Sequence, residues 1–339
     1  MMGWMSCHSA DREAPTGRNG EDAGMAPAPE AQTRIVSVVV PVYNDPRLAA
    51  CLEALARLAL PQGWRLETVV VDNGSRDPVT SLCARWPDVR FLVETRKGSY
   101  AARNTGLRST TGEVVAFTDS DCRPAHHWLL VALRRLADEP GIAAVAGRVQ
   151  TVFDTDGPTT APGWWDKVEA FPQRRYVASG FGVTANLIVR REAGAAVGWF
   201  DDEFLSGGDA NFGRRLTASG RTIVYEDAAV VAHPARTTWH ELFSKGRRTA
   251  QAHARVEHLR RRGAKGYLVS TYSSLVQLGG VMKTSVTHPE LMGIRGRGQY
   301  LIAGVAYRVF WFVTLCRWRI YYRRQDARGG LRQTSLSLS

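Results

Sequence analysis

The stretch from Val114 to Asp121, VVAFTDSD, places two acidic side chains directly after a run of apolar residues. Val114 to Phe117 are apolar and compatible with β structure, which predicts a buried strand. The strand must deliver Asp119 and Asp121 to the rim of its sheet, because a buried unpaired carboxylate is costly. Open α/β sheets bind ligands at that rim. Two carboxylates one residue apart suit Mg²⁺ or Mn²⁺ bound to a diphosphate, although a turn rich in Asp and Ser has the same composition.

Three more apolar runs and two helical patterns come before this strand. Strand patterns cover residues 35–42, 66–71 and 89–93, and apolar residues at helical spacing cover 47–58 and 100–108. The first run is almost continuously apolar, which is typical of a parallel strand with both faces buried. Strands that alternate with helices at this spacing form right-handed βαβ units. The pattern therefore predicts an α/β fold with a mostly parallel central sheet.

Several motifs that bind phosphate or perform nucleophilic catalysis are absent from the sequence. The first strand pattern leads into Pro-Val-Tyr-Asn at 41–44, without the G-x-G-x-x-G of dinucleotide-binding folds. The sequence contains no G-x-x-x-x-G-K-[ST] phosphate loop, no H-E-x-x-H, no C-x-x-C and no G-x-S-x-G nucleophile elbow. A phosphate group would therefore have to be held by a metal ion and basic side chains.

Six segments, in this order and spacing, resemble the motifs of family 2 glycosyltransferases. The resemblance covers about residues 34–234, and it implies the GT-A fold, a Rossmann-like α/β architecture with a mostly parallel central sheet. Each motif alone is common, but six in the right order are specific. The segments are 38–44 (VVVPVYN), 69–75 (VVVDNGS), 103–106 (RNTG), 119–121 (DSD), 198–209 (with GWFDD and GGD) and 228–233 (AAVVAH).

The resemblance implies a donor site along the ends of the first, second and fourth strands. Tyr43 would stack on the nucleobase beside Pro41, and Asp72 would accept a hydrogen bond from the base. Asp119 would contact the ribose or the metal ion, and Ser120 belongs to the same substrate-binding group. These five residues, together with Arg103, are the expected substrate-binding residues.

The same resemblance implies that Asp121 and His233 hold a Mg²⁺ or Mn²⁺ ion that bridges the diphosphate. Without it, a lone histidine at a strand end would be assigned to the surface or to the core. Arg103 would lie near the nucleotide, with Arg96 and Lys97 as open alternatives.

Asp209 matches the aspartate of the family's usual Glu-Asp pair, which implies that it is the catalytic base. The sequence departs from the family here, because Gly208 stands where the glutamate is common. An inverting transfer needs one base behind the attacking hydroxyl, so this loss affects the expected acceptor contacts more than the reaction. Asp209 also begins a helical pattern at 211–219, and an aspartate in such a place is commonly an N-cap.

The function implied is an inverting, metal-dependent glycosyl transfer from a nucleotide sugar, with a UDP-sugar expected, to a hydroxyl of a glycan or lipid-linked acceptor. The chemistry needs charge neutralised on the departing diphosphate and a base near the acceptor. A sugar-nucleotide pyrophosphorylase is an alternative, although it usually begins with a glycine-rich basic loop. A non-catalytic sugar-nucleotide- or membrane-binding module is another, and Asp121, Asp209 and His233 together argue against it.

The positive charge of the chain is confined to its C-terminal part. The 339 residues have a formal net charge of +12, but residues 241–339 carry 18 Lys and Arg against 4 Asp and Glu, whereas residues 1–240 carry a net charge of −2. The predicted catalytic part is nearly neutral, which argues against a nucleic-acid groove and favours an anionic partner for the C-terminal part.

An apolar segment lies within this basic part. Residues 301–316 are apolar apart from Arg308, which is shorter than the run of about 20 residues that spans a membrane. With its flanking arginines and aromatic residues, the segment predicts an interfacial helix over 298–322 on an anionic membrane surface. A helix that packs on the catalytic core, with arginines reaching solvent, is the equal alternative. Residues 238–262 predict a further helix, basic on one side.

These patterns divide the chain into four parts. Residues 1–33 are expected to be disordered, 34–237 to form the GT-A domain, 238–325 to form a helical basic extension, and 326–339 to be a disordered tail. No signal peptide is evident, and five scattered cysteines imply no disulfide framework, which suits a reducing cytosol. We therefore expect a cytoplasmic protein, peripheral at the inner face of the membrane.

Overall fold

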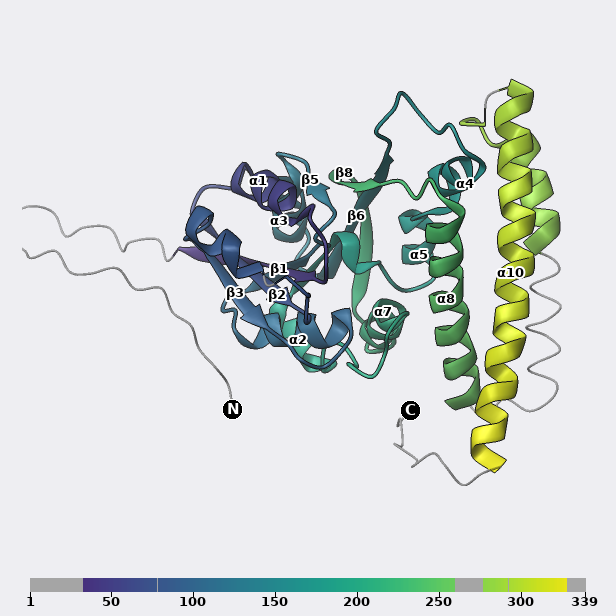
Figure 1. Cartoon of the computed structure of the whole chain (residues 1–339). Coiled ribbons are helices and arrows are strands. Elements are labelled where there is room, and N and C mark those ends of the chain that lie inside the picture. The colour runs from purple at the N-terminus through teal and green to yellow at the C-terminus, as the bar shows by residue number, and fades with distance from the viewer. Residues whose placement is uncertain (1–32, 78, 260–276, 292, 328–339) are drawn as a thin grey trace, which may run out of the picture. The chain divides into compact units, whose positions relative to one another are not determined.

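The computed structural model describes residues 33–77, 79–259, 277–291 and 293–327. The two segments predicted to be disordered lie outside the described residues, apart from their innermost positions. The described part contains one eight-stranded sheet flanked by helices, and Figure 1 shows the long helix α10 beside helix α8 at one end of the molecule.

The strands of the sheet run in the order β3-β2-β1-β4-β7-β6-β8-β5. Their bounds are β1 Arg34–Val42, β2 Trp64–Asp72, β3 Val89–Val93, β4 Val114–Phe117, β5 Arg123–Pro124, β6 Ile142–Val152, β7 Leu187–Arg190 and β8 Thr222–Pro234. The α-helices are α1 Leu48–Ala56, α2 Ser99–Arg108, α3 Trp128–Asp138, α4 Ala161–Glu169, α5 Gln173–Ala178, α6 Arg191–Ala196, α7 Gly208–Ala218, α8 Trp239–Leu259 and α10 Gly293–Ala327, and a further helix covers 277–287.

The predicted parallel sheet is confirmed in its N-terminal half. Strand β1 pairs in parallel with β2 and β4, and β2 pairs in parallel with β3. The sheet then becomes mixed, because β7 runs antiparallel to both β4 and β6. The predicted α/β class is correct. The alternation of strand and helix patterns in the sequence did not predict the antiparallel strand β7.

Strand β1 is buried on both faces, as its continuous apolar run predicts. Val36, Val38 and Val40 pack in one core cluster with apolar residues of α1 and α3, whereas Val39 packs in another with residues of α2 and α7. Because side chains alternate along a strand, the helices form a layer on each face of the sheet.

Two strand pairings bring distant segments together at one edge of the sheet. The short strand β5 pairs antiparallel with β8, with Arg123 opposite Ala232. This register places the residues just before β5 beside His233, the next residue along β8. His233 is also opposite Thr151 in the parallel pairing of β6 with β8. The end of β8 is therefore fixed by backbone pairing on two sides.

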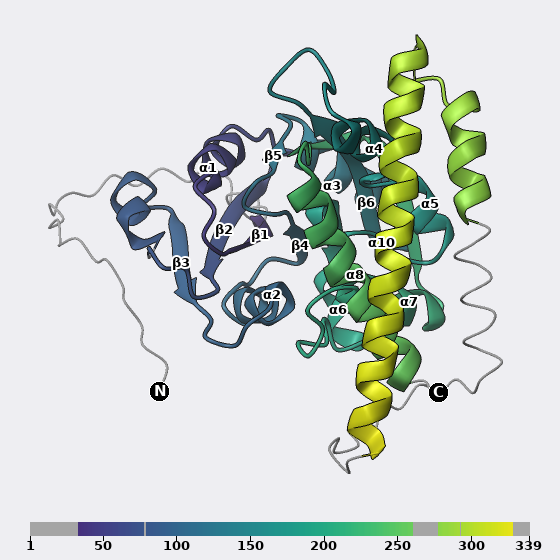
Figure 2. The same ribbon diagram turned by 45° about the vertical axis from the view of Figure 1, so that its right-hand side comes forward.

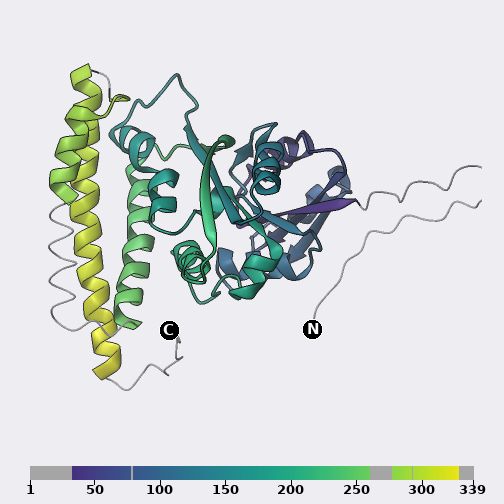
Figure 3. The ribbon, with the colours of Figure 1, turned by 180° about the vertical axis from the view of Figure 1, so that it is seen from behind.

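The C-terminal helices pack on one another and on α4. Figures 2 and 3, seen with Figure 1, show α8 between α10 and the sheet. Trp165 of α4 stacks on Tyr300 of α10, with 5.3 Å between ring centroids. Arg319 of α10 forms a buried ion pair with Glu257 of α8, with 2.8 Å between Nε and Oε2. The helix predicted over 238–262 is confirmed as α8, and α10 contains the helix predicted over 298–322.

Candidate active site

A cavity of about 1100 Å³ lies at the carboxyl ends of the parallel strands. Its walls come from the ends of β1, β4 and β8, from the segment before α2, and from α7 and α8. This is the rim where open α/β sheets bind ligands. Of the residues predicted for the site, all except Asp72 line this one cavity: Pro41, Tyr43, Arg103, Asp119, Ser120, Asp121, Asp209 and His233.

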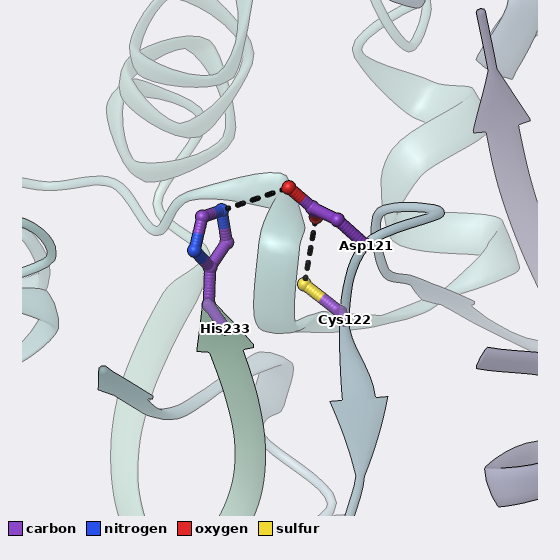
Figure 4. A group of neighbouring side chains, drawn as sticks. All are labelled: Asp121, Cys122 and His233. Carbon is purple, nitrogen blue, oxygen red and sulfur yellow. Dashed lines mark hydrogen bonds and ion pairs between the residues drawn. The ribbon is translucent and has the colours of Figure 1, made fainter. Parts of the chain in front are cut away.

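Asp121 and His233 meet at one corner of the cavity (Figure 4). The Asp121 Oδ2 atom lies 3.5 Å from His233 Nε2, and the Cys122 Sγ atom lies 3.6 Å from Asp121 Oδ1. Ligand atoms of the three side chains all lie within 4.8 Å of one another. Their places follow from the β5–β8 pairing, because Asp121 and Cys122 directly precede β5 and His233 lies near the end of β8.

The donor atoms at this corner fit a divalent cation. Burial raises the pKa of the Asp121 carboxyl, and the charge of protonated His233 opposes this shift. Burial lowers the pKa of the His233 imidazole, so the neutral, metal-binding form is favoured. The backbone oxygen of Pro234 lies 2.7 Å from His233 Nδ1, which leaves Nε2 facing Asp121. A carboxylate and a neutral imidazole are ligands that Mn²⁺ accepts, and Mg²⁺ prefers oxygen.

Cys122, the third residue of this group, is also part of the hydrophobic core. Its side chain is fully buried in the cluster that includes Trp128. Burial raises the pKa of its thiol well above the usual range, which favours the protonated form in the absence of a metal ion. A protonated thiol is a poor ligand for Mg²⁺ or Mn²⁺. Cys122 is therefore a small, fully buried residue of the core.

Asp119 and Ser120 are each held by a polar partner. The guanidinium of Arg103, which is buried in α2, donates to Asp119 Oδ1 and lies over the Tyr100 ring. The Ser120 hydroxyl lies 3.3 Å from Asp45 Oδ2. One oxygen of the Asp119 side chain is therefore bound by Arg103, which holds the carboxyl group in a fixed orientation toward the cavity.

The predicted nucleotide side of the cavity is formed by the ends of β1 and β2. Pro41 is buried in the wall, whereas Tyr43 is 61% exposed and free to face a ligand. Asp72 is buried, and its Oδ1 atom accepts a hydrogen bond from the Ser75 amide at 2.9 Å. The adjacent wall is made by Asn73 and Gly74. The role of Asp72 toward a base stays a prediction.

Three basic residues were alternatives for a contact near the nucleotide, and the structure distinguishes between them. Arg103 and Lys97 line the cavity, but Arg96 does not. Arg96 instead forms ion pairs with Glu94 and Asp202.

Asp209 lies in the first turn of α7, but it is not the N-cap that one interpretation of the sequence predicted. The N-cap is Gly207, whose left-handed φ of 79° suits glycine. The Asp209 carboxylate accepts a hydrogen bond from the Ala210 amide at 2.8 Å. Burial raises its pKa, while hydrogen bonds from Ala210 and Tyr100 and the charge of Arg103 lower it. A desolvated carboxylate at a cavity wall is suited to accept a proton.

Three cationic residues of the cavity wall were missed by the sequence analysis. Arg236 follows β8, and Lys245 and Arg248 lie on α8. The basic side predicted for residues 238–262 was the available signal, but it did not indicate that this side faces the cavity.

A family model described as glycosyl transferase family 2 matches residues 37–195. The chain is 31% identical over 228 residues to glycosyltransferase AglE of Haloferax volcanii, which covers 65% of this chain and 73% of AglE. It is also 31% identical over 241 residues to succinoglycan biosynthesis protein ExoM of Rhizobium meliloti, which covers 66% of this chain and 76% of ExoM. The chain belongs to glycosyl transferase family 2, and it is a glycosyltransferase.

A third relative is longer than this chain. The pre-mycofactocin glycosyltransferase of Mycobacterium tuberculosis is 34% identical over 213 residues, which are 60% of this chain and 43% of that protein. The chain thus spans less than half of that relative's length.

The GT-A fold is confirmed by a solved structure. Mannosyltransferase PcManGT from Pyrobaculum calidifontis, in complex with GDP-Man and Mn²⁺, superposes with a TM-score of 0.56. The match covers 88% of this chain and 89% of that chain at 21% sequence identity. The predicted GT-A class, with its helical C-terminal segment, is therefore correct.

Proposed function

We propose that the protein catalyses an inverting transfer of a sugar from a nucleotide-sugar donor to an acceptor hydroxyl. The observation that carries this proposal is the shared cavity, in which Asp121 and His233 form one corner and Asp209 another part of the wall. Asp119 interacts electrostatically with both Asp121 and Asp209. The groups that a glycosyl transfer needs are therefore close to one another.

Asp121 and His233 are proposed to hold the divalent cation, Mg²⁺ or Mn²⁺. Bound there, the cation would neutralise charge on the departing diphosphate. Asp121 would supply a carboxylate oxygen and His233 its Nε2 atom, the two atoms that lie 3.5 Å apart. Arg47, whose Nη2 atom lies 3.5 Å from Asp121 Oδ2, would add positive charge at the same corner.

Asp209 is proposed to be the base that takes the proton of the acceptor hydroxyl. Its carboxylate is oriented by the Ala210 amide and by Tyr100. A carboxylate whose pKa is raised by burial binds a proton more tightly, which suits a general base. The single carboxylate left by the Gly208 substitution is enough for a displacement with inversion.

The donor is proposed to lie along the ends of β1, β2 and β4. Tyr43 would stack on the base beside Pro41, Asp72 would hydrogen-bond to it, and Asp119 and Ser120 would contact the ribose and phosphates. Arg103 would keep Asp119 in place. A UDP-sugar is the first donor to test, and the GDP-Man bound by PcManGT makes GDP-sugars the second.

The acceptor is proposed to be a glycan or a lipid-linked glycan. Tyr176 and Phe181 line the cavity as a stacked aromatic pair, with 4.8 Å between ring centroids. The charge of Asp209 contributes to the pKa of Tyr176, which burial raises to about 12. An aromatic surface near the base suits the apolar face of a sugar ring. The similarity to ExoM, a succinoglycan biosynthesis protein, supports a polysaccharide acceptor.

The test is to screen UDP-sugars and GDP-sugars with Mn²⁺ or Mg²⁺ for release of the nucleoside diphosphate, in wild type and in Asp209→Asn. Release by the wild type alone supports the proposal. Formation of a nucleoside triphosphate from a nucleotide sugar and pyrophosphate would instead indicate the pyrophosphorylase alternative. Donor binding without any turnover, with and without glycan acceptors, would indicate the non-catalytic module.

We also propose that the protein is cytoplasmic and binds the inner face of the membrane through α10. By length and composition, Gly293–Gln325 is the one helix among the described residues that could cross a membrane. Its packing against α8 and α4 supports an interfacial position, because one side of the helix is covered by protein.

The other side of α10 supports the same proposal. Five exposed apolar residues fall within an arc of about 80° at 3.6 residues per turn: Ile302, Val305, Val309, Val313 and Ile320. Exposed arginines flank this stripe, and the segment 293–325 contains no acidic residue. An apolar stripe with basic flanks suits an anionic lipid surface.

A further inference from the structure

One wall of the cavity is formed by α8 and the end of β8, and three cationic side chains line this wall. Arg236 follows β8, and Lys245 and Arg248 lie three residues apart on α8. Residues three or four apart share a face of a helix, so Lys245 and Arg248 face the same space. The nucleotide-binding roles proposed above use none of the three.

The positive charge of this wall is only partly neutralised within the protein. Asp166 is the one carboxylate among the described residues within ion-pair distance of these side chains: its Oδ1 atom lies 3.2 Å from Arg236 Nη1 and 3.8 Å from Lys245 Nζ. Asp166 is completely buried beneath them. One carboxylate serves two cations, and Arg248 adds a third charge. Glu169 also acts electrostatically on Lys245, so the wall carries a net positive charge that the neighbouring carboxylates only partly cancel.

The ring of Phe171 fixes this wall next to the proposed metal corner. Arg236 and Lys245 lie 5.4 Å and 5.3 Å from its centroid. The same ring packs on the imidazole of His233, with 4.6 Å between centroids. The cations therefore lie on the side of the cavity where a diphosphate bound through Asp121 and His233 would carry its charge.

Lys245 has lost much of its hydration. Burial lowers its pKa to about 8, and the neighbouring charge of Arg236 acts in the same direction. Its ammonium group has one hydrogen bond, to the backbone oxygen of Ala170 at 3.2 Å. An ammonium that is desolvated and next to other cations gains strongly from an added anion.

We infer that Arg236, Lys245 and Arg248 form a phosphate-binding subsite on the α8 side of the cavity. The inference rests on the proposed function, because it places a nucleotide-sugar donor in the same cavity. Two sources could supply the phosphate: the diphosphate of the donor, or a phosphate group carried by the acceptor. Binding needs no covalent step, since the subsite acts by charge and hydrogen bonds.

Arg248 gives the cleanest test, because Arg236 and Lys245 also contact Asp166 and thereby support the fold. Arg248 is exposed and forms no ion pair among the described residues. Its neighbour Arg247 is also exposed but does not line the cavity. Arg248→Gln and Arg247→Gln therefore remove the same charge from adjacent positions, one inside the cavity and one outside it.

Calorimetric titration of the full chain with Mn²⁺ present would measure the affinities for inorganic pyrophosphate, orthophosphate, UDP and GDP. We expect Arg248→Gln to weaken pyrophosphate binding about tenfold, as the loss of one charged hydrogen bond implies, and Arg247→Gln to leave it unchanged. Lys245→Met, which keeps the length of the side chain, should give a comparable loss. Circular dichroism would show that each variant is folded.

Competition separates the two sources of phosphate. If the subsite takes the donor's diphosphate, pyrophosphate competes with UDP or GDP, and Arg248→Gln weakens the nucleotide. If it takes an acceptor phosphate, orthophosphate still binds to protein saturated with nucleotide, and Arg248→Gln abolishes that binding alone. The inference would be overturned if Arg248→Gln and Lys245→Met each bound pyrophosphate and orthophosphate with the same affinity as the wild type. A wild type that binds these anions but neither nucleotide would contradict the proposed donor instead.

Discussion

The ring of Tyr100 fills the space that a side chain at position 208 would need. A Cβ atom added to Gly208 would lie 2.7 Å from Cε2 of Tyr100. The Tyr100 hydroxyl also hydrogen-bonds to Asp209. The departure from the family's usual Glu-Asp pair therefore has a structural counterpart: a buried phenol on α2 occupies the place beside Asp209.

The contact predicts an energetic coupling between the two positions. Gly208→Ala should lower the free energy of unfolding by about 1–3 kcal/mol, because an added methyl would overpack the site. In a Tyr100→Leu background the same change should cost much less, because the ring is gone. Urea unfolding of both single variants and the double variant measures the coupling.

Gly279→Ala is the matched control, since a Cβ at this helical glycine would meet nothing within 4 Å. Alanine should leave the stability there unchanged or raise it. Equal costs of Gly208→Ala in the two backgrounds would show that the Tyr100 ring is not what excludes a side chain.

A second prediction concerns Asp209 as the proposed catalytic base. Asp209→Asn keeps the size of the side chain but removes its basicity, so sugar transfer should fall by roughly 10²–10⁴-fold. Nucleotide affinity and melting temperature should stay close to those of the wild type. Asp138→Asn, an exposed position at the end of α3, provides the control for loss of an aspartate. Normal turnover by Asp209→Asn would mean that another residue is the base.

The pH dependence of transfer should report on the same carboxylate. Burial raises the pKa of Asp209, and a base acts only when ionised. The rate should therefore fall with decreasing pH at values above those of an exposed aspartate. The Tyr100 hydrogen bond opposes the shift, so Tyr100→Phe should raise this pKa further and move the acid limb of kcat to higher pH. If the acid limb of the pH profile stays at the same pH in Tyr100→Phe, Asp209 is not the group whose titration the profile reports.

Much of the fold could be predicted because local patterns determine it. The apolar run at 35–42 and the acids after Phe117 correctly indicated a buried parallel strand and a charged sheet rim. The antiparallel strand β7, Leu187–Arg190, was missed because three apolar residues and an arginine carry too little pattern to reveal a strand or its direction. Helix α4, Ala161–Glu169, was not predicted either, although its Pro162 lies in the first turn, where proline is tolerated.

The site was less accessible to sequence reasoning, because it depends on pairings between distant segments. The contact of Asp121 with His233 requires β5 to pair with β8, and a strand of two residues has no recognisable pattern. The cations of α8 form a similar case. Helical spacing predicts that Lys245 and Arg248 share a face, but only the packing of α8 decides that this face meets the cavity.

The metal corner gives a fourth prediction. Chelation with EDTA and the substitution Asp121→Ala should each weaken binding of the nucleoside diphosphate, because both remove the cation that would bridge protein and phosphate. Cys122→Ala should retain metal-dependent binding, since its thiol is a core group with a raised pKa. Calorimetry with Mn²⁺, Mg²⁺ and EDTA measures all three. Equal nucleotide affinity in EDTA would rule out a metal-dependent site, and loss of binding in folded Cys122→Ala would make the cysteine a ligand.

The last prediction concerns the outward stripe of α10. Each engaged arginine contributes about 1 kcal/mol at an anionic leaflet, so the protein should sediment with anionic liposomes and be released by high salt, which screens exposed charge. Val309 and Val313 are each 51% exposed, so Val309→Asp/Val313→Asp should abolish sedimentation while leaving nucleotide binding intact. Removal of the whole helix is a poorer test, because Tyr300 and Leu315 are fully buried on its inner side.

Val93→Asp is the matched control for that double variant, because this valine is 64% exposed on β3, away from α10. It adds one of the same charges without touching the stripe, and it should sediment like the wild type. If α10 instead serves only to pack on α8 and α4, the wild type will not sediment with liposomes of any charge. Equal sedimentation of the wild type and the stripe variant would place the lipid-binding surface elsewhere, and would remove the structural reason for expecting a lipid-linked acceptor.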